Sequence, residues 1–282
     1  LAAPAQGAAA VPGQPAPAAP AARERVEVTT DVYRLTFDSE GGSLTHAELL
    51  KPVDMADKSP TFLLFDESAA RVYVAQTGLI GGAYPTHKTV MQAVPGPRAL
   101  LDGENELSVR FESPDLGGLK LVKTWTLKRG SYDMAVAHEV VNTGSTAVSP
   151  QLYLQLVRDG NPPPGESSFY STFTGPAVYT DAKKYQKVDF KKIEEGKPEF
   201  EKTATNGYVA MVQHYFASAW LLGDGITREL FMRKVDSNLY SVGMITPVGE
   251  IAPGASKTVQ AQLFAGPQVE TMMEKLYPGL EL

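Results

Sequence analysis

The chain has 282 residues and contains no cysteine. Disulfides, thiolate nucleophiles and cysteine metal sites are therefore excluded together. No run reaches the roughly 18–20 consecutive apolar residues of a spanning helix, so no part is predicted to cross a membrane as a helix. Basic charge is not in excess either, because 26 Lys and Arg face 32 Asp and Glu. A net charge of −6 gives no overall attraction for nucleic acid, and no nucleic-acid partner is predicted.

Motifs of common catalytic and cofactor sites are also missing. Neither HExxH nor GxSxG occurs, and no histidines pair at metal-binding spacing among His46, His87, His138 and His214. The glycine-rich stretch 78–83 fits neither a dinucleotide fingerprint nor a phosphate loop. We therefore predict no catalytic residue, no metal and no cofactor. A zinc site built from three distant histidines is the alternative left open.

The composition of the chain changes near residue 25. Residues 1–24 are mostly Ala, Pro, Gly and Gln, which is typical of an extended linker and equally of a plain terminus. From residue 25 apolar and polar residues alternate, as in Tyr33, Leu35 and Phe37, which indicates half-buried strands. The clearest hairpin runs over 119–141, with a turn at KRGS (128–131). Many short strands separated by turns predict an all-β sandwich or barrel over 25–266.

Residues 267–282 predict a short amphipathic helix. Pro267 suits a first helical position and Pro278 ends the helix. Its apolar stripe, at spacing i, i+3, i+4 and i+7, consists of Val269, Met272, Met273 and Leu276. The stripe is expected to pack on the sandwich, with a membrane or a partner as the alternatives.

Two internal stretches differ from the rest. Residues 181–202 carry seven lysines and six acids, which indicates a solvated face or loop. NGYVAMVQHYFASAW (206–220) is apolar on both alternation sets, so it predicts two strands that are covered on both faces and bent near Gln213 and His214. His214 is accordingly interpreted as a structural core residue, and His138, on an apolar strand face, as a satisfied core histidine.

Several segments together resemble one family. YVAMVQHYFASAW is similar to the signature of the large periplasmic domain of the YidC family of bacterial inner-membrane protein insertases. The segments 37–50 (FDSEGGSLTHAELL), 124–144 (TWTLKRGSYDMAVAHEVVNTG), 173–195 and 251–268 resemble further blocks of that domain, in the same order. The resemblance spans roughly residues 26–282, and loops such as 81–97 depart from it.

The resemblance implies a β-supersandwich, galactose-mutarotase-like and with a C-terminal helix, on the periplasmic side of the bacterial inner membrane. It implies tethering between the first two membrane spans of a full-length insertase that works alone or with the Sec translocon. The expected partners are that translocon or its SecDF-type accessory subunits, and nascent inner-membrane proteins. No catalytic residue carries over.

Two surfaces are candidates for contacts. Mixed charge with aromatics favours the first, which consists of Lys183, Lys184, Tyr185, Lys187, Phe190 and Phe200. The second is the helical stripe at 269–276, which would couple the domain to the following span. A carbohydrate-binding or mutarotase-like module is the alternative function, and a passive spacer is a third.

Overall fold

The computed structural model describes residues 21–50, 61–163 and 172–268. Within them the chain forms two sheets of nine strands each and one short helix, α1 (Phe190–Glu194). The first sheet has the order β1 (Arg25–Thr29), β2 (Tyr33–Asp38), β3 (Ser43–Leu49), β4 (Phe62–Glu67), β5 (Val72–Ile80), β10 (Gln151–Asp159), β17 (Leu239–Pro247), β16 (Arg228–Asp236), β13 (Thr203–Ala204). The second has the order β12 (Lys184–Lys187), β11 (Gly175–Thr180), β14 (Tyr208–Val212), β15 (Phe216–Leu221), β18 (Ser256–Pro267), β9 (Asp133–Asn142), β8 (Leu119–Lys128), β7 (Glu106–Glu112), β6 (Gln92–Ala93).

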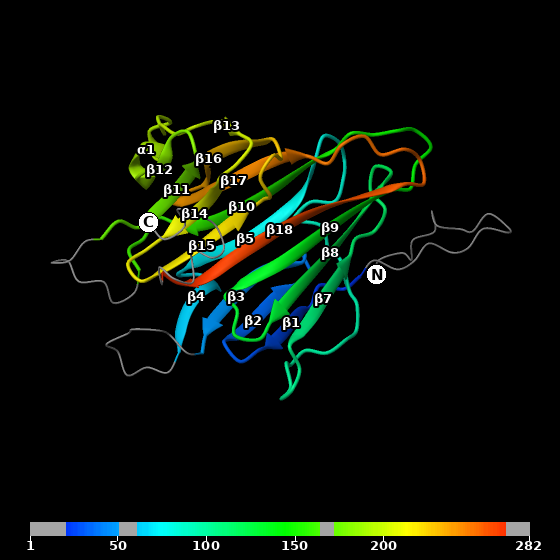
Figure 1. Cartoon of the computed structure of the whole chain (residues 1–282), viewed down its shortest axis with the longest axis horizontal. Helices are drawn as coiled ribbons and strands as arrows, with labels where there is room; N and C mark the ends of the chain where they lie inside the picture. The colour runs from blue at the N-terminus through cyan, green and yellow to red at the C-terminus, as the bar shows by residue number, and fades with distance from the viewer. Residues whose placement is uncertain (1–20, 51–60, 164–171, 269–282) are drawn as a thin grey trace, which may run out of the picture.

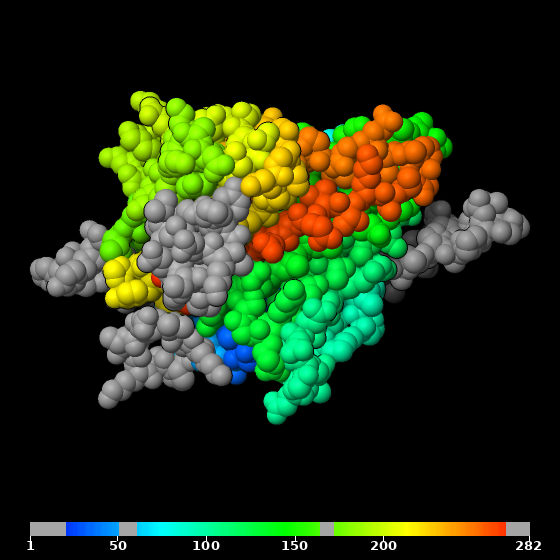
Figure 2. Space-filling model, viewed as in Figure 1, coloured from blue at the N-terminus to red at the C-terminus, as the bar shows by residue number. Residues whose placement is uncertain are grey.

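The two sheets lie face to face, with long strands running obliquely along the molecule (Figure 1). Strand β18 crosses the middle of the visible face, where it pairs with β15 on one side and β9 on the other (Figure 2). Named neighbours pair antiparallel throughout the described strands. The predicted all-β sandwich is therefore confirmed.

Alternation along the strands explains the core. In β8 the residues Leu119, Leu121, Trp125 and Leu127 are at most 1% exposed. In the neighbouring β9, Met134, Val136 and Val140 are fully buried. These faces meet the inward residues of the first sheet in one continuous apolar cluster.

Two indole groups also form hydrogen bonds between the two sheets. Trp125 donates to the Gly42 carbonyl (3.1 Å), and Trp220 donates to the Gln155 carbonyl (2.9 Å).

The predicted hairpin over 119–141 and its turn are confirmed. The 119–141 hairpin is β8–β9, and EGGS (40–43) joins β2 to β3. At the C-terminal side, Pro267 belongs to β18 and pairs with Phe216, so it ends a strand and does not open a helix. The predicted helical stripe Val269, Met272, Met273 and Leu276 and the linker residues 1–20 lie outside the described residues.

Candidate functional site

The charged segment 181–202 joins the two sheets at one end of the molecule (Figure 1). It supplies β12 at the edge of the second sheet, then α1, and leads into β13 at the edge of the first sheet. The predicted partner-binding residues therefore lie on one continuous segment that bridges both layers.

Its aromatic residues face inward. Tyr185, Phe190 and Phe200 are partly buried and pack against the main core. The Phe190 ring lies 5.0 Å from that of Tyr240, and burial raises the pKa of Tyr185. These three side chains anchor the segment to the core.

Its lysines face solvent. Lys183, Lys184 and Lys187 are exposed, and Lys187 Nζ lies 5.4 Å from the centre of the Tyr185 ring. In α1, Glu194 accepts hydrogen bonds from Lys234 (2.6 Å) and Tyr240 (2.8 Å), and these bonds lower the pKa of Glu194. The segment thus presents positive side chains on a backbone that is fixed by its aromatic residues.

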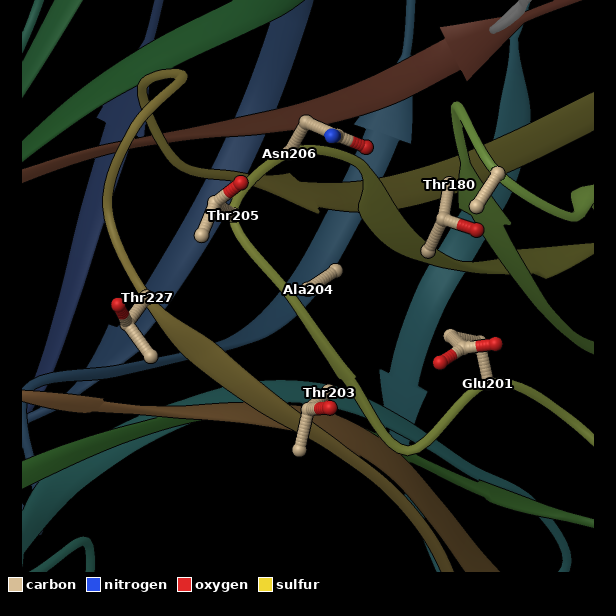
Figure 3. A pocket seen from close by; sticks show the side chains of 8 residues that line it. Thr180, Glu201, Thr203, Ala204, Thr205, Asn206 and Thr227 are labelled. Carbon is tan, nitrogen blue, oxygen red and sulfur yellow. The ribbon is translucent and has the colours of Figure 1, made fainter.

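A pocket of about 360 Å³ lies beside this segment (Figure 3). Thr180 and Glu201 lie on one side of it, Thr205 and Thr227 on the other, and Ala204 between them (Figure 3). Threonine hydroxyls and amides suit hydrogen bonding to a polar chain. Glu201 is its only charged lining residue among the described ones, so the pocket holds no pair of groups for acid–base chemistry.

A buried arginine holds the loops around this pocket. The Arg228 side chain is fully buried and donates to the carbonyls of Gly207 (2.8 Å), Ile226 (3.0 Å) and Thr205 (3.3 Å). Sequence reasoning did not identify it, because the acceptors are backbone atoms of loops and leave no side-chain signature.

A second buried polar cluster lies between the sheets. Lys123 has no exposed surface and donates to the carbonyls of Gly41 and Thr77 (2.6 Å for Thr77). Its strand partner His138 contacts the Thr77 hydroxyl (2.9 Å) and the Val259 carbonyl (3.2 Å). Burial lowers the pKa of Lys123 to about 7 and, with the Lys123 charge, that of His138 to about 3. The prediction of a satisfied core histidine at 138 is confirmed, whereas Lys123 was missed.

The stretch 206–220 forms β14 and β15, buried on both faces as predicted. The core assignment of His214 is wrong, however, because His214 and Tyr215 are exposed in the turn between these strands, with Tyr215 55% exposed. A hairpin needs a turn, and Gln213 closes it by donating its backbone N–H to the Phe216 carbonyl (3.0 Å). His214 contacts Tyr215 only at ring–ring distance (3.9 Å).

No group of three or more potential metal ligands gathers anywhere in residues 21–50, 61–163 and 172–268. Over the same ranges, no helix has the length and apolar character needed to cross a membrane.

Solved structures resemble this chain in fold. A galactose mutarotase related enzyme from Lactobacillus acidophilus has a TM-score of 0.53 at 8% identity, covering 86% of this chain and 97% of that one. A putative aldose 1-epimerase from Escherichia coli has a TM-score of 0.51 at 10% identity, covering 87% and 100%. The mutarotase-like sandwich is thereby confirmed as an architecture, and at such identities only as an architecture.

Sequence relatives identify the family. The membrane protein insertase YidC of Janthinobacterium sp. (strain Marseille) is 47% identical over 270 residues, which is 96% of this chain and 48% of the relative. That of Cupriavidus necator is 50% identical over 273 residues, 97% of this chain and 48% of the relative. The chain thus spans about half the length of the curated relatives it matches. The YidC periplasmic domain family matches residues 25–282, and the chain belongs to that family.

Proposed function

We propose that this chain is a non-enzymatic interaction domain, on the periplasmic side of the bacterial inner membrane, of a full-length insertase that inserts and folds inner-membrane proteins. The observation that carries this proposal is the family match over residues 25–282. In this role the domain docks the Sec translocon or its accessory subunits and helps clients on the outer side of the membrane.

The segment 181–202 is the proposed docking surface. Its exposed Lys183, Lys184 and Lys187 stand on a backbone that Tyr185 and Phe190 fix to the core. Because this backbone is already ordered, binding to an acidic partner surface would order only the lysine side chains, which lowers its entropy cost. The lysines are therefore expected to contribute more to docking than the aromatic residues.

A sugar-converting activity has weaker support. Epimerisation at a sugar carbon needs a paired acid and base. The pocket beside 181–202 has Glu201 without a histidine, and a second pocket, which is lined by His87, has no carboxylate in its lining. A third pocket, of about 120 Å³, does place His46 3.5 Å from Asp66, but no Phe, Tyr or Trp lines it to stack on a sugar ring. Likeness of fold alone does not transfer the activity.

In the decisive experiment, residues 26–265 are deleted from the full-length insertase, and its membrane-spanning helices are kept. Co-purification with the Sec translocon is expected to fall, and insertion of a Sec-dependent client is expected to slow. Reversal of the three lysines to glutamate should lower co-purification, whereas reversal of Lys257, exposed on β18, should not. Undiminished co-purification by the stably expressed deletion protein would refute the docking role.

A further inference from the structure

A second pocket, of about 350 Å³, lies on the outer face of the first sheet. Strand β10 alternates, with Leu152, Leu154 and Leu156 in the core between the sheets, so Tyr153 and Gln155 point away from it. Tyr153, Phe231 and Ile245 form a small apolar cluster separate from the main core, with Ile80 packed against it. Four strands, β5, β10, β16 and β17, thus contribute to one apolar floor.

Two glycines shape that floor. A Cβ atom at Gly78 would lie 2.3 Å from the Tyr153 hydroxyl oxygen, and one at Gly243 would lie 2.3 Å from Phe231 Cζ. Gly78 pairs with Tyr153 across β5 and β10, and Gly243 pairs with Phe231 across β17 and β16. Each ring therefore lies over a strand that has no side chain at that point. Both rings lie close over the sheet and keep only a small exposed part, 8% for Tyr153 and 9% for Phe231, so the floor is a narrow aromatic strip.

The rim of this pocket is cationic. Lys88 and Arg233 both line it and are exposed, and the Arg233 guanidinium lies 4.5 Å from the centre of the Phe231 ring. Within the described part of the chain, neither forms an ion pair with a carboxylate. Glu229 lies on the same face of β16 but outside the lining. In a chain of net charge −6, this is a local reversal of sign.

His87 adds a neutral imidazole. The Tyr153 hydroxyl accepts from the His87 backbone N–H (2.9 Å) and lies 2.6 Å from Nδ1 of the same residue. When the hydroxyl donates to Nδ1, the ring proton lies on Nε2. Burial and the nearby lysine charges lower the pKa of His87 to about 4, so the imidazole is neutral near pH 7. The pocket then combines two cations and one neutral imidazole with an aromatic floor.

We propose that this pocket binds extended polypeptide in which an acidic side chain neighbours an aromatic one, namely the translocated segments of client membrane proteins. This inference rests on the proposed function. Lys and Arg are concentrated in the cytoplasmic loops of membrane proteins, so translocated loops are poor in them and their Asp and Glu are left uncompensated. Arg233 and Lys88 match those carboxylates, while the exposed parts of Phe231, Tyr153 and Ile80 meet the apolar neighbour.

The test measures fluorescence anisotropy of labelled peptides with the 282-residue chain. One peptide alternates glutamate with phenylalanine, and two matched peptides carry glutamine or lysine in place of glutamate. The acidic peptide is expected to bind most tightly and to weaken as salt is raised. Arg233→Glu and Lys88→Glu should each weaken it by about tenfold, an ordinary effect for a charge at a binding site. Lys257→Glu, outside the pocket, should change it less than about twofold.

Fold integrity is checked by thermal melts, and Phe231→Ala separately tests the aromatic floor. Equal binding of the three peptides, or binding unaffected by the Arg233 and Lys88 reversals, would overturn the inference. Reversal-sensitive binding of anionic lipid vesicles without peptide binding would overturn it as well. Failure of the proposed function is distinguishable: the deletion protein would then keep full co-purification and insertion while the isolated chain still bound acidic peptide.

Discussion

Replacing Lys123 by methionine tests the energetics of the polar cluster between the sheets. The amine is fully buried and contacts two backbone carbonyls and no carboxylate among its hydrogen-bond partners in the described residues. Burial lowers its pKa to about 7, whereas lysine in an unfolded chain titrates near about 10.4. Between these values the unfolded chain binds more protons than the folded one, so the free energy of unfolding rises with pH.

The expected size follows from that difference in proton binding. The slope reaches at most about 1.4 kcal/mol per pH unit, so from pH 7 to pH 9 the wild type should gain about 2 kcal/mol relative to Lys123→Met. Loss of the amine's hydrogen bonds changes the free energy of unfolding of Lys123→Met by the same amount at every pH. It therefore does not alter the predicted difference in slope. His138 does not interfere, because its pKa of about 3 keeps it neutral throughout this range.

Urea denaturation at pH 7, 8 and 9 measures the effect. Lys120→Met is the matched control, because Lys120 lies on the same strand with its side chain 36% exposed. Its stability should run parallel to that of the wild type. Parallel curves for Lys123→Met would refute the reasoning and would mean that the two carbonyls hold a charged ammonium in the core.

Four further outcomes are expected. Arg228→Met should lower the free energy of unfolding by about 3 kcal/mol in urea denaturation, because several buried carbonyls lose a charged donor; a loss below about 1 kcal/mol would contradict this. The wild type should lose about 2 kcal/mol from pH 7 to pH 5 through His138, whose folded pKa lies below its unfolded value, and His138→Gln should show a flatter profile in the same assay. His214→Ala should shift stability by less than about 0.5 kcal/mol, and a larger loss would restore a structural role for this exposed turn residue. Phe200→Ala should lower the melting temperature while Lys184→Ala leaves it unchanged, and equal effects would contradict the division between anchoring and exposed residues.

Alternation of apolar and polar residues predicted the strands, because successive side chains of a half-buried strand point to the core and to solvent in turn. It placed the β8–β9 hairpin and the turn at 128–131 correctly. It did not place Lys123, which occupies an inward position between Leu121 and Trp125. The carbonyls that accept hydrogen bonds from its amine belong to residues 41 and 77, which are far from Lys123 in the sequence. Local sequence patterns therefore could not predict these bonds.

Sites assembled from distant strands were also beyond local patterns. The second pocket, on the outer face of the first sheet, is lined by Ile80, Tyr153, Phe231 and Ile245. These residues come from four strands that the sheet topology brings together. The stretch 206–220 shows the opposite limit, since its apolar residues run nearly unbroken through a turn. Tyr215 is exposed there because the chain must reverse, which hydrophobicity alone does not record.

The two sheets end in short strands. The terminal strands contain from two to five residues, in β13, β6, β12 and β1. Residues 98–100 also bond to Thr29 at the outer side of β1. At β1 and β12 an incoming strand finds an edge of at most five residues, so these two borders resist aggregation by strand addition. Along these borders the fold therefore gives a stray extended segment little backbone on which to start a fibre.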